Sequence, residues 1–152
     1  MERIASFCVD HTTLMPGMYL SRQDGEVRTW DVRMKRPNKG DYLSPAAAHT
    51  IEHLFATYAR NSRWSDHVVY VGPMGCLTGF YLLTQGMSDA EALQLTQEAF
   101  AWMAEYDGPI PGASESECGN YRLMDPAAAR QECRTMLAVL QKLDADHLRY
   151  QP

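Results

Sequence analysis

Residues 45–60 carry the pattern that most constrains how this chain can fold. Apolar residues recur there at steps of three and four, as in a helix with one buried stripe: Ile51, Leu54, Phe55 and Tyr58. Ser44 and Pro45 are typical of a helix start, because serine caps the first turn and proline is tolerated at its first position. We therefore predict a helix from about Pro45 to Arg60 that packs one face against a core.

Four segments with strand patterns lie before and after this helix. Residues 3–9 and 26–34 alternate polar and apolar side chains, which is the two-residue period of a half-buried strand. Residues 67–71 and 78–84 are short apolar runs, rich in β-branched and aromatic residues, on either side of a bend at residues 72–73. These segments predict an antiparallel sheet.

Two further helices are predicted in the second half of the chain. A capping box at residues 88–91, in which a serine and a glutamate bond to each other's backbone, opens a helix that we expect to end near Tyr106. An Asp-Pro pair at residues 125–126 opens a last helix, expected to end near Leu143. The glycines and prolines of residues 107–124 predict a loop between them.

The order of these elements decides the predicted fold class. Strands come mostly first and helices mostly later, without the regular alternation of a doubly wound parallel sheet. We therefore predict an α+β fold in which an antiparallel sheet packs against helices. The chain has 152 residues, 45% of them hydrophobic and 22% charged, which is typical of one globular domain spanning residues 1–152.

Charge and apolar runs exclude several classes of partner. The formal net charge is −5 and the basic residues are spread along most of the chain, so no nucleic-acid-binding surface is predicted. No apolar run is long enough to span a membrane, and the N-terminal residues lack the apolar core of a signal peptide. We therefore expect a cytoplasmic protein with reduced cysteines.

One short basic stretch allows two interpretations. It contains four charged residues: Arg33, Lys35, Arg36 and Lys39. The stretch is either a solvated strand edge, or it includes one inward-pointing arginine that holds an anionic part of a ligand. Its sequence pattern alone does not separate the two.

A pair of histidines gives the strongest chemical signal. His49 and His53 lie one turn apart on the predicted helix, with Glu52 beside them, so both imidazoles can reach one metal ion. The alternative is a chance pair on a surface helix. Two histidines leave a divalent ion under-coordinated, because catalytic zinc-like sites generally have three protein ligands and one open position.

Two cysteines are candidates for the missing chemistry. Cys118 is the best third ligand, because the loop of residues 107–124 can bend back to the helix and a thiolate binds such ions strongly. Cys76 follows the bend at residues 72–73, where its sulfur can face a pocket and act as a general base if a nearby cation favours the thiolate. For each cysteine the alternative is a small buried core residue.

These residues belong to a set of motifs that covers nearly the whole chain. Its main segments are His49-Thr50-Ile51-Glu52-His53, Gly72-Pro73-Met74-Gly75-Cys76 and Glu117-Cys118-Gly119. Two earlier segments belong to it as well: Ser6-Phe7-Cys8-Val9-Asp10-His11-Thr12 and Asp31-Val32-Arg33. The set resembles the S-ribosylhomocysteine lyase family, the autoinducer-2 synthesis enzymes of bacterial quorum sensing.

The resemblance implies a homodimer of α+β subunits with active sites at the interface. Each subunit would hold one ferrous ion, or zinc or cobalt as substitutes, through three ligands: His49, His53 and Cys118. Cys76 and Glu52 would carry the proton transfers. Three further residues would line the substrate pocket, contributed across the interface: Ser6, His11 and Arg33.

The activity that the resemblance implies is a carbon–sulfur lyase of the methyl cycle. It converts S-ribosylhomocysteine to homocysteine and 4,5-dihydroxy-2,3-pentanedione by aldose–ketose isomerisations followed by β-elimination. A metal ion can polarise the sugar carbonyl as a Lewis acid while nearby bases move the protons. The chain departs from the family at Tyr70, Gly72 and Cys8, which puts hydrogen bonds near Cys76 in doubt.

Two other functions share part of these motifs. His-x-x-Glu-His is also the inverzincin pattern of metallopeptidases, in which the glutamate activates water and a downstream carboxylate completes the site. Alternatively, a non-enzymatic protein would close a structural site on the same ligands, with Cys76 or His11 as the fourth. Core packing is expected for Cys133 and solvent exposure for His147, without further chemistry.

Overall fold

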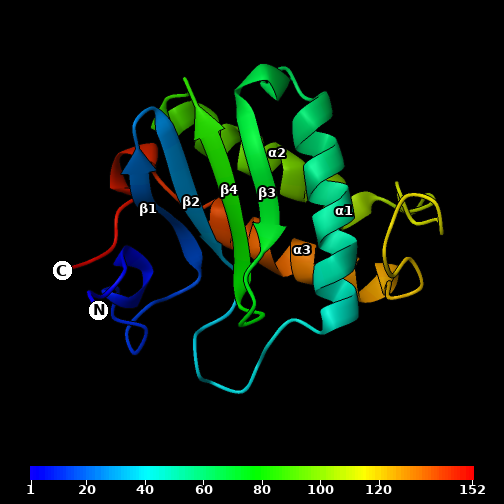
Figure 1. Cartoon of the computed structure of the whole chain (residues 1–152), viewed down its shortest axis with the longest axis horizontal. Coiled ribbons are helices and arrows are strands. Elements are labelled where there is room, and N and C mark those ends of the chain that lie inside the picture. The colour runs from blue at the N-terminus through cyan, green and yellow to red at the C-terminus, as the bar shows by residue number, and fades with distance from the viewer.

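Four antiparallel strands and three α-helices make up the fold in the computed structural model, which describes residues 1–152 (Figure 1). With η marking short 3-10 helices, the elements are η1 (Ala5–Phe7), β1 (Gly17–Asp24), β2 (Val27–Arg33), α1 (Pro45–Asn61), η2 (Ser65–His67), β3 (Val68–Pro73), β4 (Gly79–Gln85), α2 (Asp89–Glu105), α3 (Pro126–Leu140) and η3 (Ala145–His147). The predicted α+β class with an antiparallel sheet is confirmed.

The strands lie in the order β1-β2-β4-β3, and every neighbouring pair is antiparallel. β1 and β2 form a hairpin whose turn contains Gly25 with a φ of 60°, a left-handed conformation that glycine adopts without steric cost. β2 and β4 are the inner strands, so β1 and β3 form the two edges. In Figure 1, α1 runs beside β3, while α2 and α3 lie behind the sheet.

One hydrophobic core joins the sheet to the helices. It contains 28 buried residues between Met18 and Leu148. At its centre, Phe55 of α1 packs against Phe80 of β4, with ring centroids 6.3 Å apart, and against Phe100 of α2 at 5.3 Å. In the predicted apolar stripe of α1, Ile51, Leu54 and Phe55 are buried and Tyr58 is half-buried. This packing fixes which face of the helix points away from the core.

Side-chain caps define where the three α-helices begin, as the sequence predicts. Ser44 accepts a hydrogen bond from a backbone amide in the first turn of α1. Ser88 and Glu91 form the complete capping box at the start of α2, and Asp125 caps α3. α3 ends at Leu140, earlier than predicted. None of these helices is both long enough and apolar enough to cross a membrane.

The predicted strand at residues 3–9 is wrong. Part of this segment forms η1, in which the amides of Phe7 and Cys8 bond back to carbonyls three residues earlier, at 3.0 Å each. Alternating polarity does not supply a pairing partner, and both sides of β2 are taken by β1 and β4. β1 was not predicted from the sequence, because its inward-facing apolar pattern is short: Met18 is buried and Leu20 is half-buried before the strand becomes polar.

Cys133 on α3 is fully buried in the core, as predicted. Burial, with a smaller contribution from the neighbouring Glu132 carboxylate, raises the pKa of this thiol far above its ordinary value of 9.0. In the unfolded chain the same thiol ionises near that ordinary value. At pH values between the two, the folded state therefore holds more protons than the unfolded state, and stability falls as the pH rises.

We predict that Cys133→Ala reduces the loss of stability at alkaline pH. Between pH 7 and pH 10 the free energy of unfolding should fall by about 1.4 kcal/mol more for the wild type, because one thiol ionises only on unfolding. Urea unfolding at both pH values measures this difference. Cys8→Ala, at an exposed cysteine, is the matched control. Equal pH slopes for Cys133→Ala and the wild type would contradict the effect of burial.

Candidate functional site

Two histidines of α1 face each other through their Nε2 atoms. These atoms of His49 and His53 are 3.1 Å apart, and the rings meet edge to face with centroids 4.7 Å apart. Each ring is held from behind: Nδ1 of His49 lies 2.7 Å from the carbonyl oxygen of Leu123, and Nδ1 of His53 lies 2.8 Å from that of Pro111. Because a carbonyl only accepts, each Nδ1 carries a hydrogen and each Nε2 presents a lone pair.

Cys118 completes a group of three ligand atoms. Its sulfur lies 3.4 Å from Nε2 of His49, and the ligand atoms of His49, His53 and Cys118 all lie within 4.8 Å of one another. Three electron-pair donors at this separation repel one another unless a cation or a proton lies between them. Two imidazoles and one thiolate therefore suit a divalent ion such as zinc, ferrous iron or cobalt, with a fourth position open.

A cavity next to one of the three ligands, His53, is also lined by Glu52. This carboxylate precedes His53 on α1, and both residues line a cavity of about 380 Å³ that we call the metal-side cavity. Its other lining residues are Ala56, Thr57, Arg60, Tyr70, Val71, Pro111 and Gly112. A carboxylate at this position can exchange protons with a molecule bound next to an ion.

Cys76 lines a different cavity, of about 460 Å³, that we call the Cys76-side cavity. Cys76 lies in the turn between β3 and β4. All three predicted substrate-pocket residues line the same cavity: Ser6, His11 and Arg33. Aromatic residues contribute much of the remaining wall: Phe7, Tyr42 and Tyr81. The fold thus brings together four candidate residues from three separate parts of the chain.

Arg33 points inward, so the basic stretch is not wholly a solvated strand edge, and the anionic partner of Arg33 in the structure is Asp31. Arg33 is 3% exposed and donates two hydrogen bonds to the Asp31 carboxylate, from Nε to Oδ1 at 3.1 Å and from Nη2 to Oδ2 at 2.7 Å. Nη1 donates to the hydroxyl of Thr78 at 2.8 Å. Burial disfavours the guanidinium charge, but the bonds and charge of Asp31 outweigh it and raise the pKa of Arg33.

Three residues support Arg33 although the sequence analysis assigned them no role: Asp31, Thr78 and Tyr150. Asp31 lies two residues before Arg33 on β2, so both side chains leave the same face, and this spacing was an available signal. The hydroxyl of Tyr150 donates to Oδ2 of Asp31 at 2.7 Å, and its ring stacks on Tyr19. Burial and the Asp31 charge raise the pKa of Tyr150, so this hydroxyl keeps its proton and remains a donor.

Tyr70 and Gly72, the two positions near Cys76 that we expect to depart from the family pattern, are coupled in space. A Cβ at Gly72 would lie 2.6 Å from Cε1 of Tyr70, so the tyrosine ring occupies the space that a side chain at position 72 would need. Tyr70 lines the metal-side cavity and not the Cys76-side cavity. The sulfur of Cys76 has its own partner, the hydroxyl of Thr78 at 3.0 Å.

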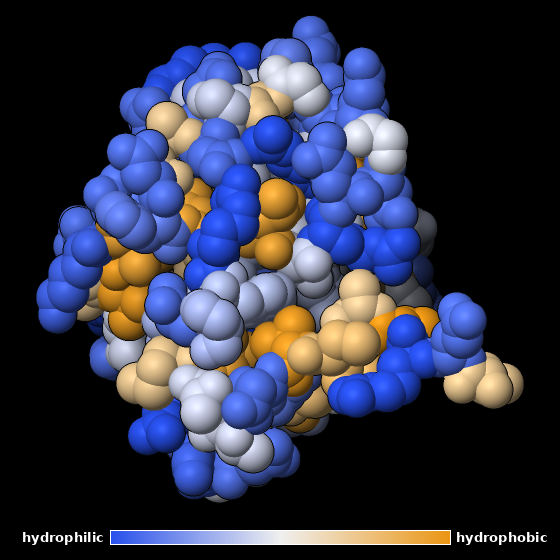
Figure 2. Space-filling model, turned by 90° about the vertical axis from the view of Figure 1, so that its left-hand side faces the viewer, coloured by the Kyte–Doolittle hydropathy of each residue, from blue (hydrophilic) through white to orange (hydrophobic).

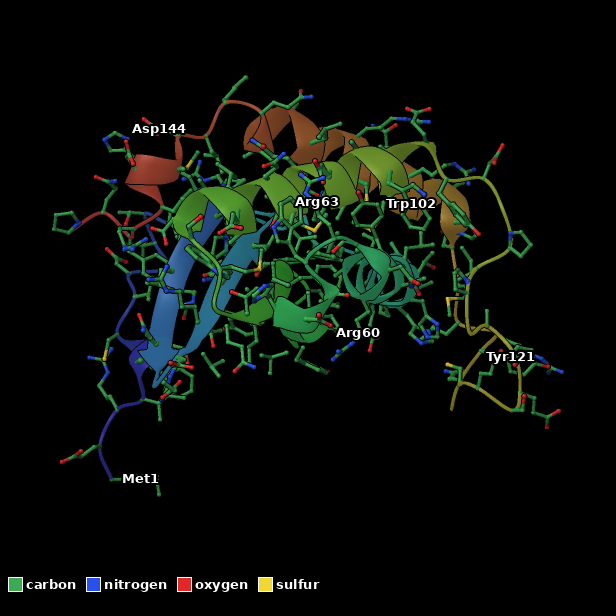
Figure 3. All side chains as sticks on the ribbon, turned by 90° about the horizontal axis from the view of Figure 1, so that it is seen from above. Met1, Arg60, Arg63, Trp102, Tyr121 and Asp144 are labelled. Atoms are coloured by element: carbon green, nitrogen blue, oxygen red, sulfur yellow. The ribbon has the colours of Figure 1, made fainter.

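The two cavities share no lining residue within one chain. Figures 1 and 3 show the N-terminal segment, which carries Ser6 and His11, and the loop of residues 107–124, marked by Tyr121 in Figure 3, at opposite ends of the molecule. One chain therefore gathers the candidate residues into two separate groups.

Comparison with known proteins gives a consistent match over the chain. A family profile described as S-Ribosylhomocysteinase (LuxS) matches residues 4–146. The chain is 47% identical to an S-ribosylhomocysteine lyase of Phocaeicola vulgatus, over 99% of this chain and 98% of that protein. Lyases of the same name from Desulfotalea psychrophila and Clostridium acetobutylicum are 46% and 43% identical, each over 99% of both chains.

We predict that the purified protein binds one cobalt(II) ion per chain through a thiolate. The near-ultraviolet charge-transfer absorption between cobalt and sulfur reports the thiolate directly, so Cys118→Ala should remove it. The same variant should weaken cobalt binding by about 100-fold or more, because one of three ligands is lost. Titration of metal-free protein measures both effects, with Cys8→Ala as the control. An unchanged absorption in Cys118→Ala would contradict this ligand assignment.

Proposed function

The chain belongs to the S-ribosylhomocysteinase family, and on this basis we propose that it cleaves S-ribosylhomocysteine to homocysteine and 4,5-dihydroxy-2,3-pentanedione, the autoinducer-2 precursor. The group of two imidazoles and one thiol carries the proposal, because three ligands leave one coordination position for a substrate oxygen. All four cysteines are free, as suits the reducing cytoplasm in which we propose that the protein works.

Ferrous iron, one ion per subunit, is the metal that we propose, with zinc or cobalt as substitutes. His49, His53 and Cys118 would hold it. When bound, the ion supplies Lewis-acid polarisation of the substrate carbonyl, and the reaction needs no change in its oxidation state. The carbonyls behind both imidazoles support this assignment, because they fix Nε2 as the ligand atom of each histidine.

Glu52 and Cys76 would move the protons. The carbonyl must shift from carbon 1 to carbon 3 of the sugar in two isomerisations. In each, a base removes a proton from the carbon next to the carbonyl, and a proton is added to the former carbonyl carbon. Glu52 is suited to transfers near the ion, because it lines the metal-side cavity with His53. Cys76, which is exposed, would accept protons as a thiolate. Loss of the proton on carbon 4 then expels homocysteine thiolate from carbon 5.

The substrate would bind beside Cys76, held by three residues: Ser6, His11 and Arg33. The Cys76-side cavity that they line has a volume of about 460 Å³, which suits a small ligand. Nδ1 of His11 lies 2.8 Å from the carbonyl of Val9, which leaves Nε2 to accept a hydrogen bond from a sugar hydroxyl. Arg33 forms three hydrogen bonds within the protein and has two N–H groups left for substrate oxygens.

We further propose a homodimer whose active sites form between subunits. In a two-fold symmetric dimer the Cys76-side cavity of one subunit can face the metal-side cavity of the other, which creates two identical complete sites. Exposed aromatic residues at the rim support such a contact, since Phe7 and Tyr42 line the Cys76-side cavity and are 65% and 45% exposed. Apolar surface among polar side chains is visible in Figure 2, on the side of the molecule that bears both chain ends.

Two other functions fit this site less well. An inverzincin peptidase uses a downstream carboxylate as the third ligand, whereas the third ligand atom here is the sulfur of Cys118. A closed structural site needs a fourth protein ligand, and both candidates for it, Cys76 and His11, line the other cavity of the chain. An open coordination position favours catalysis over either alternative.

We predict that iron-loaded protein releases homocysteine from S-ribosylhomocysteine, followed with a thiol-reactive dye. Cys76→Ala and Glu52→Gln should each lower kcat by about 10²- to 10⁴-fold while the bound iron stays at wild-type level, because each removes a proton carrier and no ligand. His147→Ala, at an exposed histidine, is the matched control. No homocysteine from wild-type protein with a full complement of iron would overturn the proposed function.

We predict that two inactive variants recover activity when their subunits mix. Cys76→Ala damages the Cys76-side half-site and His49→Ala the metal side, so a mixed dimer keeps one intact site. After random pairing of equal amounts, half of the dimers are mixed, and activity should return to roughly one quarter of the wild-type level. Co-expression of differently tagged variants measures this recovery. Activity no higher than that of the separate variants would contradict a site shared between subunits.

A further inference from the structure

The hydroxyl of Thr78 lies between a buried cation and the proposed base. Its Oγ1 atom is 2.8 Å from Nη1 of Arg33 and 3.0 Å from Sγ of Cys76. Thr78 is 2% exposed and Arg33 is 3% exposed, whereas the Cys76 side chain reaches the Cys76-side cavity. A buried hydroxyl thus connects a guanidinium to an accessible thiol.

The chemistry of the three groups determines the direction of these hydrogen bonds. A guanidinium only donates, so Oγ1 of Thr78 accepts from Arg33, and its own single hydrogen remains for another acceptor. The two sulfurs nearby are those of Cys76 at 3.0 Å and Met74 at 4.0 Å. A thiolate at Cys76 has no hydrogen to donate. The Thr78 hydroxyl must therefore be the donor whenever Cys76 is ionised.

We propose that Thr78 is a positioning residue that donates a hydrogen bond to the Cys76 thiolate while it accepts one from Arg33. A hydrogen bond to the charged form of a group favours that form, and a bond from a cation to the hydroxyl strengthens the hydroxyl as a donor. Thr78 therefore transmits the effect of a buried charge to the sulfur. The role of this thiolate in catalysis rests on the proposed function of Cys76.

The backbone around Thr78 holds its hydroxyl in place. The Thr78 carbonyl accepts hydrogen bonds from the amides of Met34 and Lys35, at 2.8 and 2.9 Å, which ties it to the end of β2. The next residue, Gly79, has no room for a side chain, because a Cβ there would lie 2.2 Å from the carbonyl oxygen of Val32. β2 and β4 therefore approach closely at this point, which holds the backbone of Thr78 beside Arg33.

Arg33 is fixed as firmly as Thr78. Its two bonds to Asp31, together with the Tyr150 hydroxyl on the same carboxylate, leave the Nη1 atom aimed at Thr78. The other titratable side chains that line the Cys76-side cavity are His11, Tyr42 and Tyr81. Burial and the charge of Asp31 raise the pKa of Tyr81, so it carries no charge near neutral pH. Arg33 is thus the permanent cation of this cavity.

Alkylation of Cys76 by iodoacetamide tests the proposal directly, because the thiolate is the reacting form. At pH 7 and in metal-loaded protein, Thr78→Val should slow modification of the Cys76 peptide, quantified by mass spectrometry, by about tenfold. Thr78→Ser, which keeps the hydroxyl, should restore at least half of the wild-type rate. In the lyase assay kcat should fall by about tenfold in Thr78→Val while KM stays within about twofold of the wild type.

Thr84→Val is the matched control, because Thr84 is another buried threonine whose hydroxyl accepts a hydrogen bond, from Nε1 of Trp30 at 3.2 Å. The alkylation rate of Cys76 in Thr84→Val should equal that in the wild type. A wild-type alkylation rate in Thr78→Val, or an equal loss in Thr78→Ser, would overturn the proposal. If the valine variant does not fold, Thr78→Ala takes its place. A wild type without lyase activity would defeat the proposed function but would leave the alkylation result valid.

Discussion

The arrangement of the three candidate ligands depends on the packing of one side chain, Phe55. Its ring packs against Phe80 of the sheet and Phe100 of α2. Complete burial of one such side chain contributes about 1.5–3 kcal/mol, and the whole apolar stripe of α1 adds to it. With that face fixed, residues one turn apart on another face have no freedom to rotate inward. His49 and His53 therefore face the loop of residues 107–124 because the opposite side of their helix is needed in the core.

The buried pair of Asp31 and Arg33 is limited by the cost of removing charges from water. Removing two opposite charges from water costs several kcal/mol each, and their attraction offsets this only when the hydrogen bonding is complete. Here it is nearly so, since Thr78 and Tyr150 take up further donor and acceptor positions. Replacement of a buried ion pair by an apolar pair of similar volume is often neutral or stabilising. The position of the ion pair beside Cys76 therefore points to a chemical role rather than to stability.

Features whose residues lie close together in the sequence could be predicted, and most contacts between distant residues could not. α1 could be placed with its cap and both histidines because every feature lies within about five turns of helix. Residues 3–9 were misread because a two-residue period says nothing about the partner of a strand. Cys118 was found by its chemistry, although it pairs with His49 across 69 positions. Tyr150 and Asp31 are 119 positions apart in the sequence, and no local sequence pattern predicts such a contact.

A chemical reason supports the placement of Cys76 and the three ligands in separate cavities. Cys76 as a thiolate is a strong ligand for the same ions that suit two imidazoles and a thiolate. Were its sulfur to join His49, His53 and Cys118, the ion would have four protein ligands and no position for substrate. In the proposed dimer Cys76 approaches from the other subunit, held in its own cavity by the hydroxyl of Thr78. In such a dimer, separation between subunits would keep one thiolate as a base while another serves as a ligand.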